Sequence, residues 1–214
     1  FNIKSVCIQR ENSRHLDINR IDIFAKACEV KSVQNFLPFY KENPAEERKS
    51  NQIFKKYKNN KKFFIHTASN ENKRSYSKGN VVELVKTISK TYKDSIIFVS
   101  DFNGIWSKWK SIENVRDVSD LDIRETASYI KRCDLFIGPD SGLMHLAGAV
   151  KTKSLVIFGS IPPSVRINRY PSHEYIRLES LDCLECWYKD CPFNIKCMRD
   201  LKVEKVFSRI KEMV

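Results

Sequence analysis

The chain has 214 residues, of which 42% are hydrophobic and 30% are charged, so it can bury a sizeable core and is not a wholly disordered protein. Its formal net charge of +12 indicates an anionic partner such as a nucleotide, a nucleic acid or a membrane surface, but a lysine-rich composition of genomic origin explains the excess equally well. No apolar run approaches the roughly 18 residues of a membrane span, and no signal peptide is recognisable, which predicts a cytoplasmic protein.

The N-terminal part of the chain has an irregular pattern. Apolar residues recur with helical spacing in residues 18–30. From Arg48 to Lys62 the sequence contains seven basic residues and no acidic one, which is typical of a linker or a solvated helix. The first residue is Phe1 rather than Met, which agrees with a piece of a longer protein.

From about residue 60 the pattern alternates between apolar runs and amphipathic segments. Strands are predicted at residues 62–66, 95–100, 115–118, 134–138 and 154–159. Helices are predicted between them, at residues 81–92, 122–131 and 141–150. Continuous apolar strands that alternate with helices indicate a parallel sheet with helices on both faces. The predicted fold class is therefore α/β, with a Rossmann-like sheet.

The segment that follows the predicted strand 134–138 has the composition of a ligand-binding loop. Asp140 or Ser141 can cap the next helix, and Gly142 lets a ligand approach the backbone. The free N–H groups and the positive end of that helix suit a diphosphate. His145 lies four residues after Ser141 and therefore on the same helical face. The same residues are also compatible with a simple helix cap and a hydrogen-bonded core histidine.

A family resemblance strengthens the first interpretation. The segment DLFIGPDSGLMHLAGAVKTKSLVIFGSIPP closely resembles the donor-binding motif of glycosyltransferase family nine, the ADP-heptose:lipopolysaccharide heptosyltransferases, over about thirty positions. Upstream, the segment FFIHTASNENKRSYSKGNVVELV resembles a second motif of that family and supplies His66, Lys73 and Arg74 in the same order. The family's Pro-Gly and Trp are replaced there, so this loop has diverged.

The resemblance implies the C-terminal half of a GT-B enzyme, in which two Rossmann-like domains face each other across a cleft. Residues 1–45 are then a remnant of the N-terminal domain and the interdomain connection, and residues 46–62 are a basic linker. Residues 63–214 are the nucleotide-sugar-binding domain, including a cysteine-rich loop at residues 183–197. No catalytic residue is expected in this chain, because in the family the base belongs to the N-terminal domain.

The resemblance also implies a donor-binding site of six residues, namely Lys73, Arg74, Asp140, Ser141, Gly142 and His145. The backbone amides of Ser141 and Gly142 would hold the diphosphate, Asp140 would bind sugar hydroxyls, and Lys73 would neutralise phosphate charge. No organic cofactor is expected beyond the nucleotide-sugar substrate. Asp101 lies near the place of a ribose-binding acid in the family, but a role in a strand-end turn is the simpler explanation.

Four cysteines near the C-terminus have the spacing C-x2-C-x4-C-x5-C, and they are Cys183, Cys186, Cys191 and Cys197. Four thiolates on one short loop favour a structural zinc or iron site. Several members of the family carry a similar cysteine-rich segment, and some bind iron through it. Two disulfides and four reduced thiols are the alternatives.

The predicted function is transfer of a sugar from a nucleotide-diphospho-sugar such as ADP-heptose, with inversion, to a lipopolysaccharide-core or protein acceptor. The alternative is a non-catalytic nucleotide-binding module, since most of the acceptor domain lies outside this chain. The basic charge predicts peripheral contact with the inner membrane. Nucleic-acid binding is less favoured, because the basic segment contains few aromatic residues for base stacking.

Overall fold

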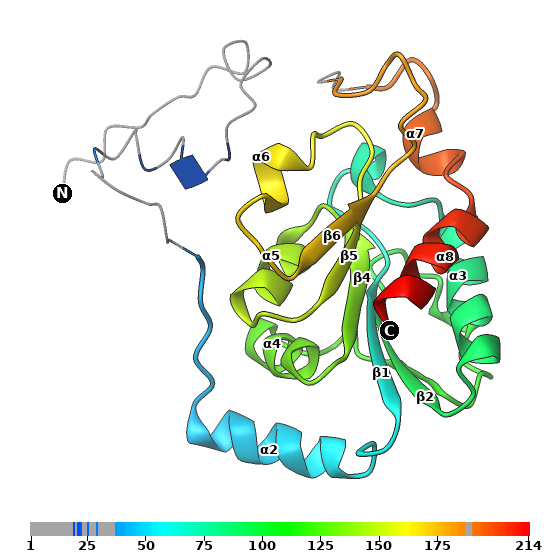
Figure 1. Ribbon diagram of the computed structural model, residues 1–214. Helices are drawn as coiled ribbons and strands as arrows, with labels where there is room; N and C mark the ends of the chain where they lie inside the picture. The colour runs from blue at the N-terminus through cyan, green and yellow to red at the C-terminus, as the bar shows by residue number, and fades with distance from the viewer. Residues whose placement is uncertain (1–18, 20, 23–24, 26–28, 30–36, 187–189) are drawn as a thin grey trace.

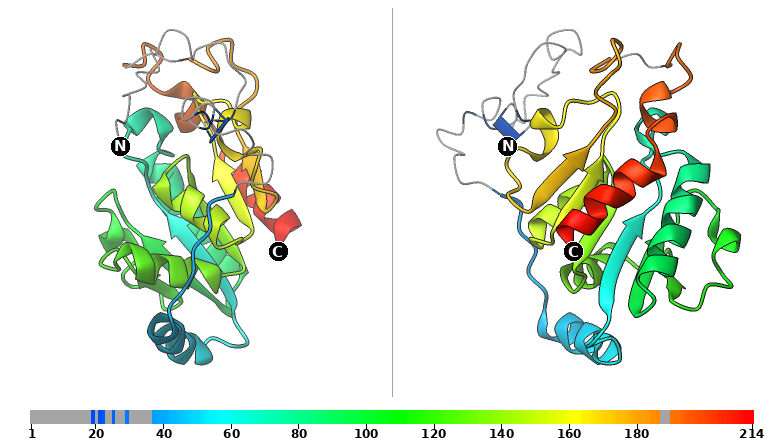
Figure 2. Two further views of the ribbon diagram at one scale, coloured as in Figure 1. Left: turned by 90° about the vertical axis from the view of Figure 1, so that its left-hand side faces the viewer. Right: turned by 45° about the vertical axis from the view of Figure 1, so that its right-hand side comes forward.

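The computed structural model describes residues 19, 21, 22, 25, 29, 37–186 and 190–214. Its centre is a six-stranded parallel sheet with the order β3-β2-β1-β4-β5-β6, covered by helices on both faces (Figures 1 and 2). The strands are β1 (Lys61–His66), β2 (Ser95–Ser100), β3 (Val115–Asp117), β4 (Leu135–Pro139), β5 (Ser154–Ile157) and β6 (His173–Ile176). The predicted α/β class and all five predicted strands are confirmed.

The helices are α2 (Pro44–Lys55), α3 (Lys78–Thr91), α4 (Ile123–Lys131), α5 (Gly142–Ala149), α6 (Ser164–Ile167), α7 (Lys196–Arg199) and α8 (Val203–Met213). Two of them begin at a capping box: Asn43 and Glu46 start α2, and Asp122 and Glu125 start α4. In each case the cap side chain accepts backbone N–H groups of the first turn. These short polar signals explain why α4 begins where the sequence predicted.

The core consists of two apolar layers, one on each side of the sheet. Along β1, Phe63 and Ile65 belong to the layer that α3 and α8 cover, and Phe64 belongs to the layer beneath α2, α4 and α5. Successive side chains of a strand point to opposite faces, so a strand that is covered on both faces must be apolar throughout. This explains the continuous apolar runs in the sequence.

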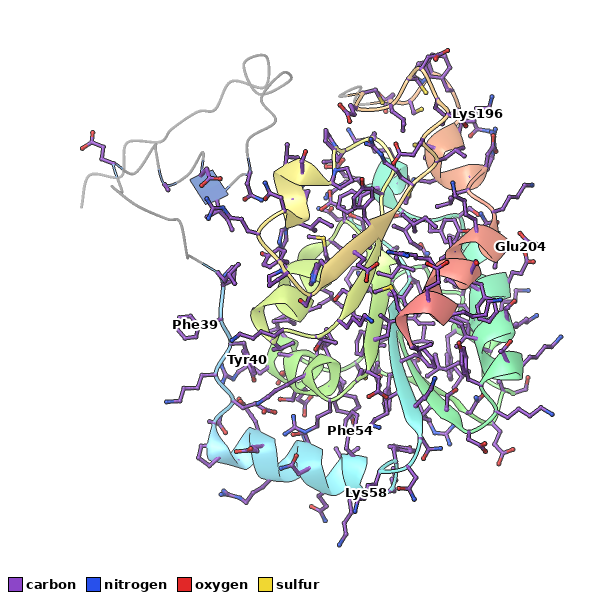
Figure 3. All side chains as sticks on the ribbon, viewed as in Figure 1. Phe39, Tyr40, Phe54, Lys58, Lys196 and Glu204 are labelled. Carbon is purple, nitrogen blue, oxygen red and sulfur yellow. The ribbon has the colours of Figure 1, made fainter. Side chains whose placement is uncertain are left out.

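The basic segment predicted as a linker or a solvated helix forms most of α2, and one of its faces is packed rather than solvated. Phe54 is 7% exposed and its ring lies 5.3 Å from that of Phe98 and 5.1 Å from that of Tyr129. Figure 3 shows Phe54 directed toward the sheet and Lys58 directed away from it. An ion pair between Arg124 and Glu46 also joins α4 to α2. The division of the chain into domains stays a prediction.

The strand order places one functionally important point in the sheet. The chain proceeds from β1 to β2 and β3 in one direction, and then returns to β4, β5 and β6 on the other side of β1. In doubly wound sheets, a crevice for ligands opens outside the carboxyl ends of the two strands at which the order reverses. In this protein those strands are β1 and β4.

The helical pattern at residues 18–30 lies mostly outside the described residues. Among the residues that the structure describes, no helix is long and apolar enough to cross a membrane.

Candidate functional site

The residues predicted to bind the donor gather at the carboxyl ends of β1 and β4. Lys73 and Arg74 lie in the loop after β1, in the short 3-10 helix η1 (Asn72–Arg74). Asp140 and Ser141 follow β4 and lead directly into α5. Side chains 66 residues apart in sequence therefore meet at the point where the strand order reverses.

An ion-pair cluster centred on Asp140 joins three segments. Asp140 is only 3% exposed. Nη1 of Arg74 donates to Oδ2 of Asp140 and to its backbone oxygen, both at 3.2 Å. Nε of Arg166, from α6, lies 3.3 Å from the same Oδ2. Two guanidinium groups thus stabilise one buried carboxylate. Arg166 was not predicted as a site residue, because it lies outside the motif and nothing local distinguishes it from other arginines.

The N-terminus of α5 is open toward this cluster. Ser141 is the N-cap residue, but its side chain makes no capping hydrogen bond. Gly142 is exposed, and a Cβ atom built there would meet nothing within 4 Å. The first N–H groups of a helix have no partner within the helix, and they carry the positive end of its dipole. The arrangement therefore suits an anion that bonds to the backbone.

At the ends of strands β1, β4 and β5, several buried side-chain atoms have no hydrogen-bond partner among the described residues. They include Nδ1 of His66, Oγ of Ser141 and Oγ of Ser160, which follow or end β1, β4 and β5. Buried polar atoms are normally bonded, so such a group indicates where a ligand or water would supply partners. Burial lowers the pKa of His66 to about 4, so its ring is neutral at pH 7.

One glycine lets β1 and β4 approach closely below the site. A Cβ atom at Gly138 would lie 3.0 Å from the ring of Phe136 and 3.2 Å from Cβ of His66. A larger side chain would push the two strands apart at the level of His66. The glycine of the motif is thus explained here by packing between neighbouring strands.

The two other predicted residues flank the site. His145, on the second turn of α5, is partly buried, and its Nδ1 lies 2.9 Å from the hydroxyl of Tyr170. Lys73 is partly buried, and its Nζ lies 3.5 Å from a carboxylate oxygen of Glu71. Both cations of η1 therefore lie beside acidic groups, and a bound anion would compete with Glu71 for them.

Asp101 has the turn role that the simpler explanation predicted. Its carboxylate accepts the backbone N–H groups of Asn103 at 2.9 Å and of Ile105 and Trp106 at 2.6 Å, and the hydroxyl of Thr67 at 3.2 Å. These bonds use both carboxylate oxygens. Asp101 thus ties the loop after β2 to the loop after β1.

The four clustered cysteines lie in the segment between β6 and α8. None of the four forms a disulfide bond with another cysteine that the structure describes. Burial, and then the neighbouring thiols of Cys186, Cys191 and Cys183, raise the pKa of Cys197 to about 11, so the four groups lie near one another. Within the described ranges, however, no group of three or more potential ligands is arranged to hold a metal ion. The alternative of two disulfides therefore finds no support among the described cysteines.

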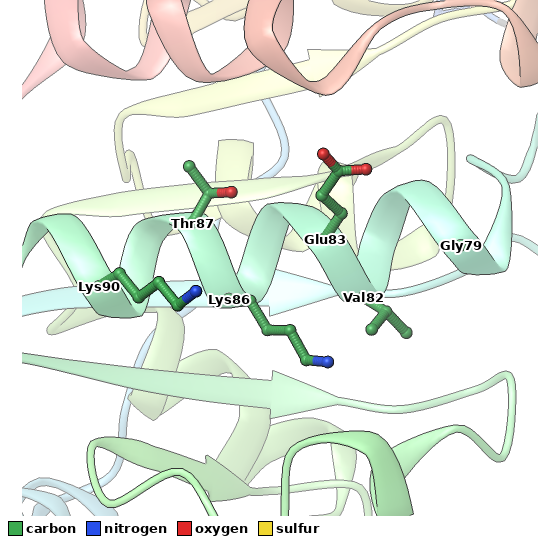
Figure 4. Close-up of a pocket in the computed structure, with 6 residues that line it drawn as sticks. All are labelled: Gly79, Val82, Glu83, Lys86, Thr87 and Lys90. Atoms are coloured by element: carbon green, nitrogen blue, oxygen red, sulfur yellow. The ribbon is translucent and has the colours of Figure 1, made fainter.

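A surface hollow lies along α3, away from these residues (Figure 4). Its lining is Gly79, Val82, Glu83, Lys86, Thr87 and Lys90, all from that one helix. The hollow contains none of the predicted site residues, and its charged side chains extend from a single helical surface. It has no convergent set of polar groups of the kind that binds a small molecule.

The fold and the site together define an α/β domain with an open helix N-terminus at its switch point. Residues 8–196 match the family model described as glycosyltransferase family 9 (heptosyltransferase). This match covers most of the chain, and the protein belongs to that family. The resemblance found in the motifs is confirmed.

Curated relatives match a shorter part of the chain. Lipooligosaccharide heptosyltransferase 2 of Campylobacter jejuni subsp. jejuni serotype O:2 is 41% identical over 96 residues, which cover 43% of this chain and 29% of that protein. Lipopolysaccharide heptosyltransferase 1 of Campylobacter coli is 32% identical over 119 residues, which cover 49% of this chain and 33% of that protein. The matched part is about a third of the length of these relatives.

Solved structures share the fold over more of the chain. The family 9 glycosyltransferase of Veillonella parvula has a TM-score of 0.69 at 10% identity, covering 93% of this chain and 61% of that one. ADP-heptose lipopolysaccharide heptosyltransferase II of Escherichia coli has a TM-score of 0.66 at 13% identity, covering 87% and 56%. The iron-containing dodecameric glycosyltransferase TibC of enterotoxigenic E. coli has a TM-score of 0.56 at 18% identity, covering 71% and 45%. The chain therefore has the fold found in GT-B glycosyltransferases.

Proposed function

We propose that this chain is the donor-binding part of a heptosyltransferase-like enzyme and binds a nucleotide-diphospho-sugar such as ADP-heptose. The observation that carries the proposal is the meeting of Arg74 and Asp140 beside the open N-terminus of α5. Structures of E. coli heptosyltransferase WaaC contain ADP or an ADP-heptose analogue, which agrees with this substrate class.

The diphosphate is proposed to lie against the first turn of α5. The backbone N–H groups of Ser141 and Gly142 would donate to its oxygens, because they have no partner within the helix. Lys73 would add a compact positive charge. As the sugar leaves, negative charge builds up on the diphosphate, and these fixed donors and this cation would stabilise it most at that stage.

Asp140 is proposed to bind the sugar through one oxygen only. Both guanidinium contacts described above reach its Oδ2. Oδ1 is therefore the atom that would accept a hydrogen bond from a sugar hydroxyl. The pairing with Arg74 and Arg166 keeps the carboxylate ionised and in place for that bond.

The remaining parts of the reaction are proposed to involve groups outside this chain. An acceptor hydroxyl, from a glycolipid or a protein, would attack the anomeric carbon from the face opposite the diphosphate, which inverts the configuration. The hydroxyl proton would pass to a carboxylate of an N-terminal domain, and the nucleoside diphosphate would leave. On this view residues 1–45 connect to that domain, and residues 63–214 bind the donor.

Calorimetry of the purified chain against ADP, UDP, GDP and the corresponding sugar nucleotides tests the proposal. We expect binding of ADP and ADP-heptose, and weaker binding after Lys73→Ala. Lys86→Ala is the matched control, because Lys86 is an exposed lysine on α3 that lines the separate hollow. If no nucleotide binds, the donor-domain proposal is wrong.

We also propose that the four cysteines bind a structural zinc or iron ion. Support comes from their spacing and their mutual proximity, and the neighbour TibC is iron-containing. Metal analysis of the purified chain should show about one ion per chain. The Cys183→Ser/Cys186→Ser variant should lack it, whereas Cys133→Ser, which changes a buried thiol elsewhere, should retain it. A metal-free parent protein would refute this proposal.

Peripheral contact with the inner membrane is proposed from charge alone. The net charge of +12 should attract the protein to vesicles that contain anionic lipids at low salt. Such attraction is screened within about 10 Å at 0.1 M salt. Sedimentation with vesicles should therefore decline steeply as salt rises, and binding that persists in high salt would contradict an electrostatic contact.

A further inference from the structure

His145 and Tyr170 form a pair beside the proposed diphosphate site. The hydroxyl of Tyr170 lies 2.9 Å from Nδ1 of His145, and the centroids of the two rings are 5.7 Å apart. Tyr170 lies in the segment between α6 and β6, which passes near α5 in Figure 1. It is 25 residues from His145 in sequence and outside the motif, so its role follows from the tertiary structure.

The position of the Tyr170 ring is tightly constrained. Tyr170 is 3% exposed. Its ring packs directly on α5 at Gly148, where an added Cβ atom would lie 2.6 Å from two ring carbons. On another side the ring of His173 lies 4.9 Å away. With contacts on both sides, the hydroxyl cannot turn away from His145 without disturbing the packing.

The direction of the hydrogen bond between Tyr170 and His145 follows from the protonation state of the Tyr170 hydroxyl. Burial raises the pKa of Tyr170, so the hydroxyl keeps its proton. Within the described part of the chain, Nδ1 of His145 is the one acceptor for that proton. If Nδ1 were itself protonated, the buried phenol would have no acceptor, which costs free energy. Tyr170 therefore donates, and the proton of the neutral imidazole is on Nε2.

His145 lies close in sequence to the first turn of α5, where the diphosphate is proposed to bind. His145 is the fourth residue of α5, and helical side chains lean toward the N-terminus of their helix. The imidazole therefore covers the first turn, where Ser141 and Gly142 present their N–H groups. A proton on Nε2 adds a side-chain donor to these backbone donors.

His173 beside this pair adds no charge at neutral pH. Its Nε2 lies 3.0 Å from the backbone oxygen of Met144 and donates to it. Burial lowers the pKa of His173 to about 4. Its tautomer is set by the Met144 carbonyl and not by Tyr170.

We propose that Tyr170 is a positioning residue whose hydroxyl holds His145 as the Nε2–H tautomer, so that the imidazole donates a hydrogen bond to the diphosphate of the donor. This inference rests on the proposed nucleotide-sugar function. It adds to that function a residue that never touches the substrate.

The first test measures the tautomer without any nucleotide. ¹⁵N NMR of the labelled chain at a pH of about 8.5, well above the ordinary imidazole pKa of about 6.5, reports which nitrogen is protonated. We expect an unprotonated, hydrogen-bonded Nδ1 for His145, and we expect this signal to shift in Tyr170→Phe. The signals of His173 should stay unchanged as an internal control. A proton on Nδ1 of His145 in the parent protein would overturn the proposal.

Tyr76→Phe is the matched control variant. It also removes a buried phenol hydroxyl, which donates to the backbone oxygen of Leu201 at 2.7 Å. Any general effect of losing a buried hydroxyl should appear in this variant too. The His145 signals should stay unchanged in Tyr76→Phe and move only in Tyr170→Phe.

The second test measures ADP binding by calorimetry in a double-mutant cycle. Tyr170→Phe should weaken binding about 2- to 10-fold, the range for one hydrogen bond. His145→Ala should weaken it at least as much, and adding Tyr170→Phe to His145→Ala should have no further effect. Additive losses, or a loss in Tyr170→Phe no larger than in Tyr76→Phe, would show a merely structural tyrosine and overturn the proposal.

The two tests separate this inference from the function on which it rests. If ADP binds but the NMR pattern is absent, only the role of Tyr170 is wrong. If the NMR pattern is present but the parent protein binds no nucleotide, the proposed function is wrong. The hydrogen bond between Tyr170 and His145 then exists but takes no part in nucleotide binding.

Discussion

At the scale of single residues, Asp140 shows how one carboxylate can organise a site. It accepts from Arg74 of the loop after β1 and lies against Arg166 of α6, and it is almost closed to water. The attraction within a buried ion pair roughly offsets the free energy of burying its two charges, so the pair adds little net stability. Removal of one partner is nevertheless strongly destabilising, because it leaves the other charge buried and unpaired. The cluster therefore serves mainly to hold the loop after β1, the end of β4 and helix α6 in one arrangement.

Replacement of Asp140 by Asn should lower the free energy of unfolding by about 3 kcal/mol, because two guanidinium groups then lose a buried carboxylate. Urea denaturation measures this change. Asp200→Asn removes a partly exposed carboxylate that pairs with Arg199 at the surface, so it should change stability little. Equal effects of the two variants would contradict the role given to Asp140.

Gly148 should be intolerant of any side chain. Gly148→Ala places a methyl group 2.6 Å from the ring of Tyr170, and overpacking of this kind costs about 1–3 kcal/mol. Gly79→Ala, at an exposed helical position where a Cβ atom meets nothing within 4 Å, should instead stabilise the protein by up to about 1 kcal/mol. Thermal unfolding of the two variants should therefore shift in opposite directions.

At the scale of elements, α2 is the clearest difference between expectation and structure. Its sequence is rich in charge, and its residues 48–55 belong to the basic run. A few apolar residues near its C-terminal end nevertheless face the core, with Ile53 and Tyr57 beside Phe54. A helix needs only one apolar stripe to be held against a sheet, so a high overall charge did not exclude packing.

Phe54→Ala should destabilise the protein by about 3–5 kcal/mol, the usual cost of removing a buried aromatic ring. Phe39→Ala is the matched control, because Phe39 precedes α2 in the chain but is 82% exposed. Its replacement should leave the urea midpoint unchanged. A neutral Phe54→Ala variant would mean that α2 is a solvated linker after all.

At the scale of the whole molecule, two buried histidines should make stability depend on pH. Burial lowers the pKa of His66 and of His173 to about 4. Unfolded chains bind these protons near pH 6.5, whereas the folded protein does not. The free energy of unfolding therefore has its full value above about pH 6.5, where both rings are neutral in the folded and the unfolded chain. It falls as the pH is lowered toward 4, because the unfolded chain then binds protons that the folded protein does not.

The free energy of unfolding should fall by up to about 1.4 kcal/mol per pH unit for each histidine between pH 6 and about pH 4. Urea denaturation at several pH values measures this slope. His173→Gln should reduce the slope by about half, since only His66 then remains. A stability that stays level from pH 7 to pH 5 would contradict the burial of these rings as neutral groups.

Local pattern predicted much of the fold. Strands β1 to β5 were predicted within one or two residues, because apolar runs are properties of neighbouring residues, whereas β6 was not predicted. The family resemblance also singled out Lys73, Arg74, Asp140, Ser141, Gly142 and His145, whose role in donor binding stays a prediction. The helical spacing of α8, with Val203, Val206 and Ile210, was present in the sequence but was not used.

The sequence by itself determined the fold class, the family and the segments that form the site, because each depends on short-range periodicity and motif. Only the tertiary structure decided that Arg166 lies against Asp140 and that Tyr170 reaches His145. It also decided that Phe54 is buried. The physical reason is that strand order and loop paths set contacts between distant residues, and no local pattern records which of many similar side chains will meet.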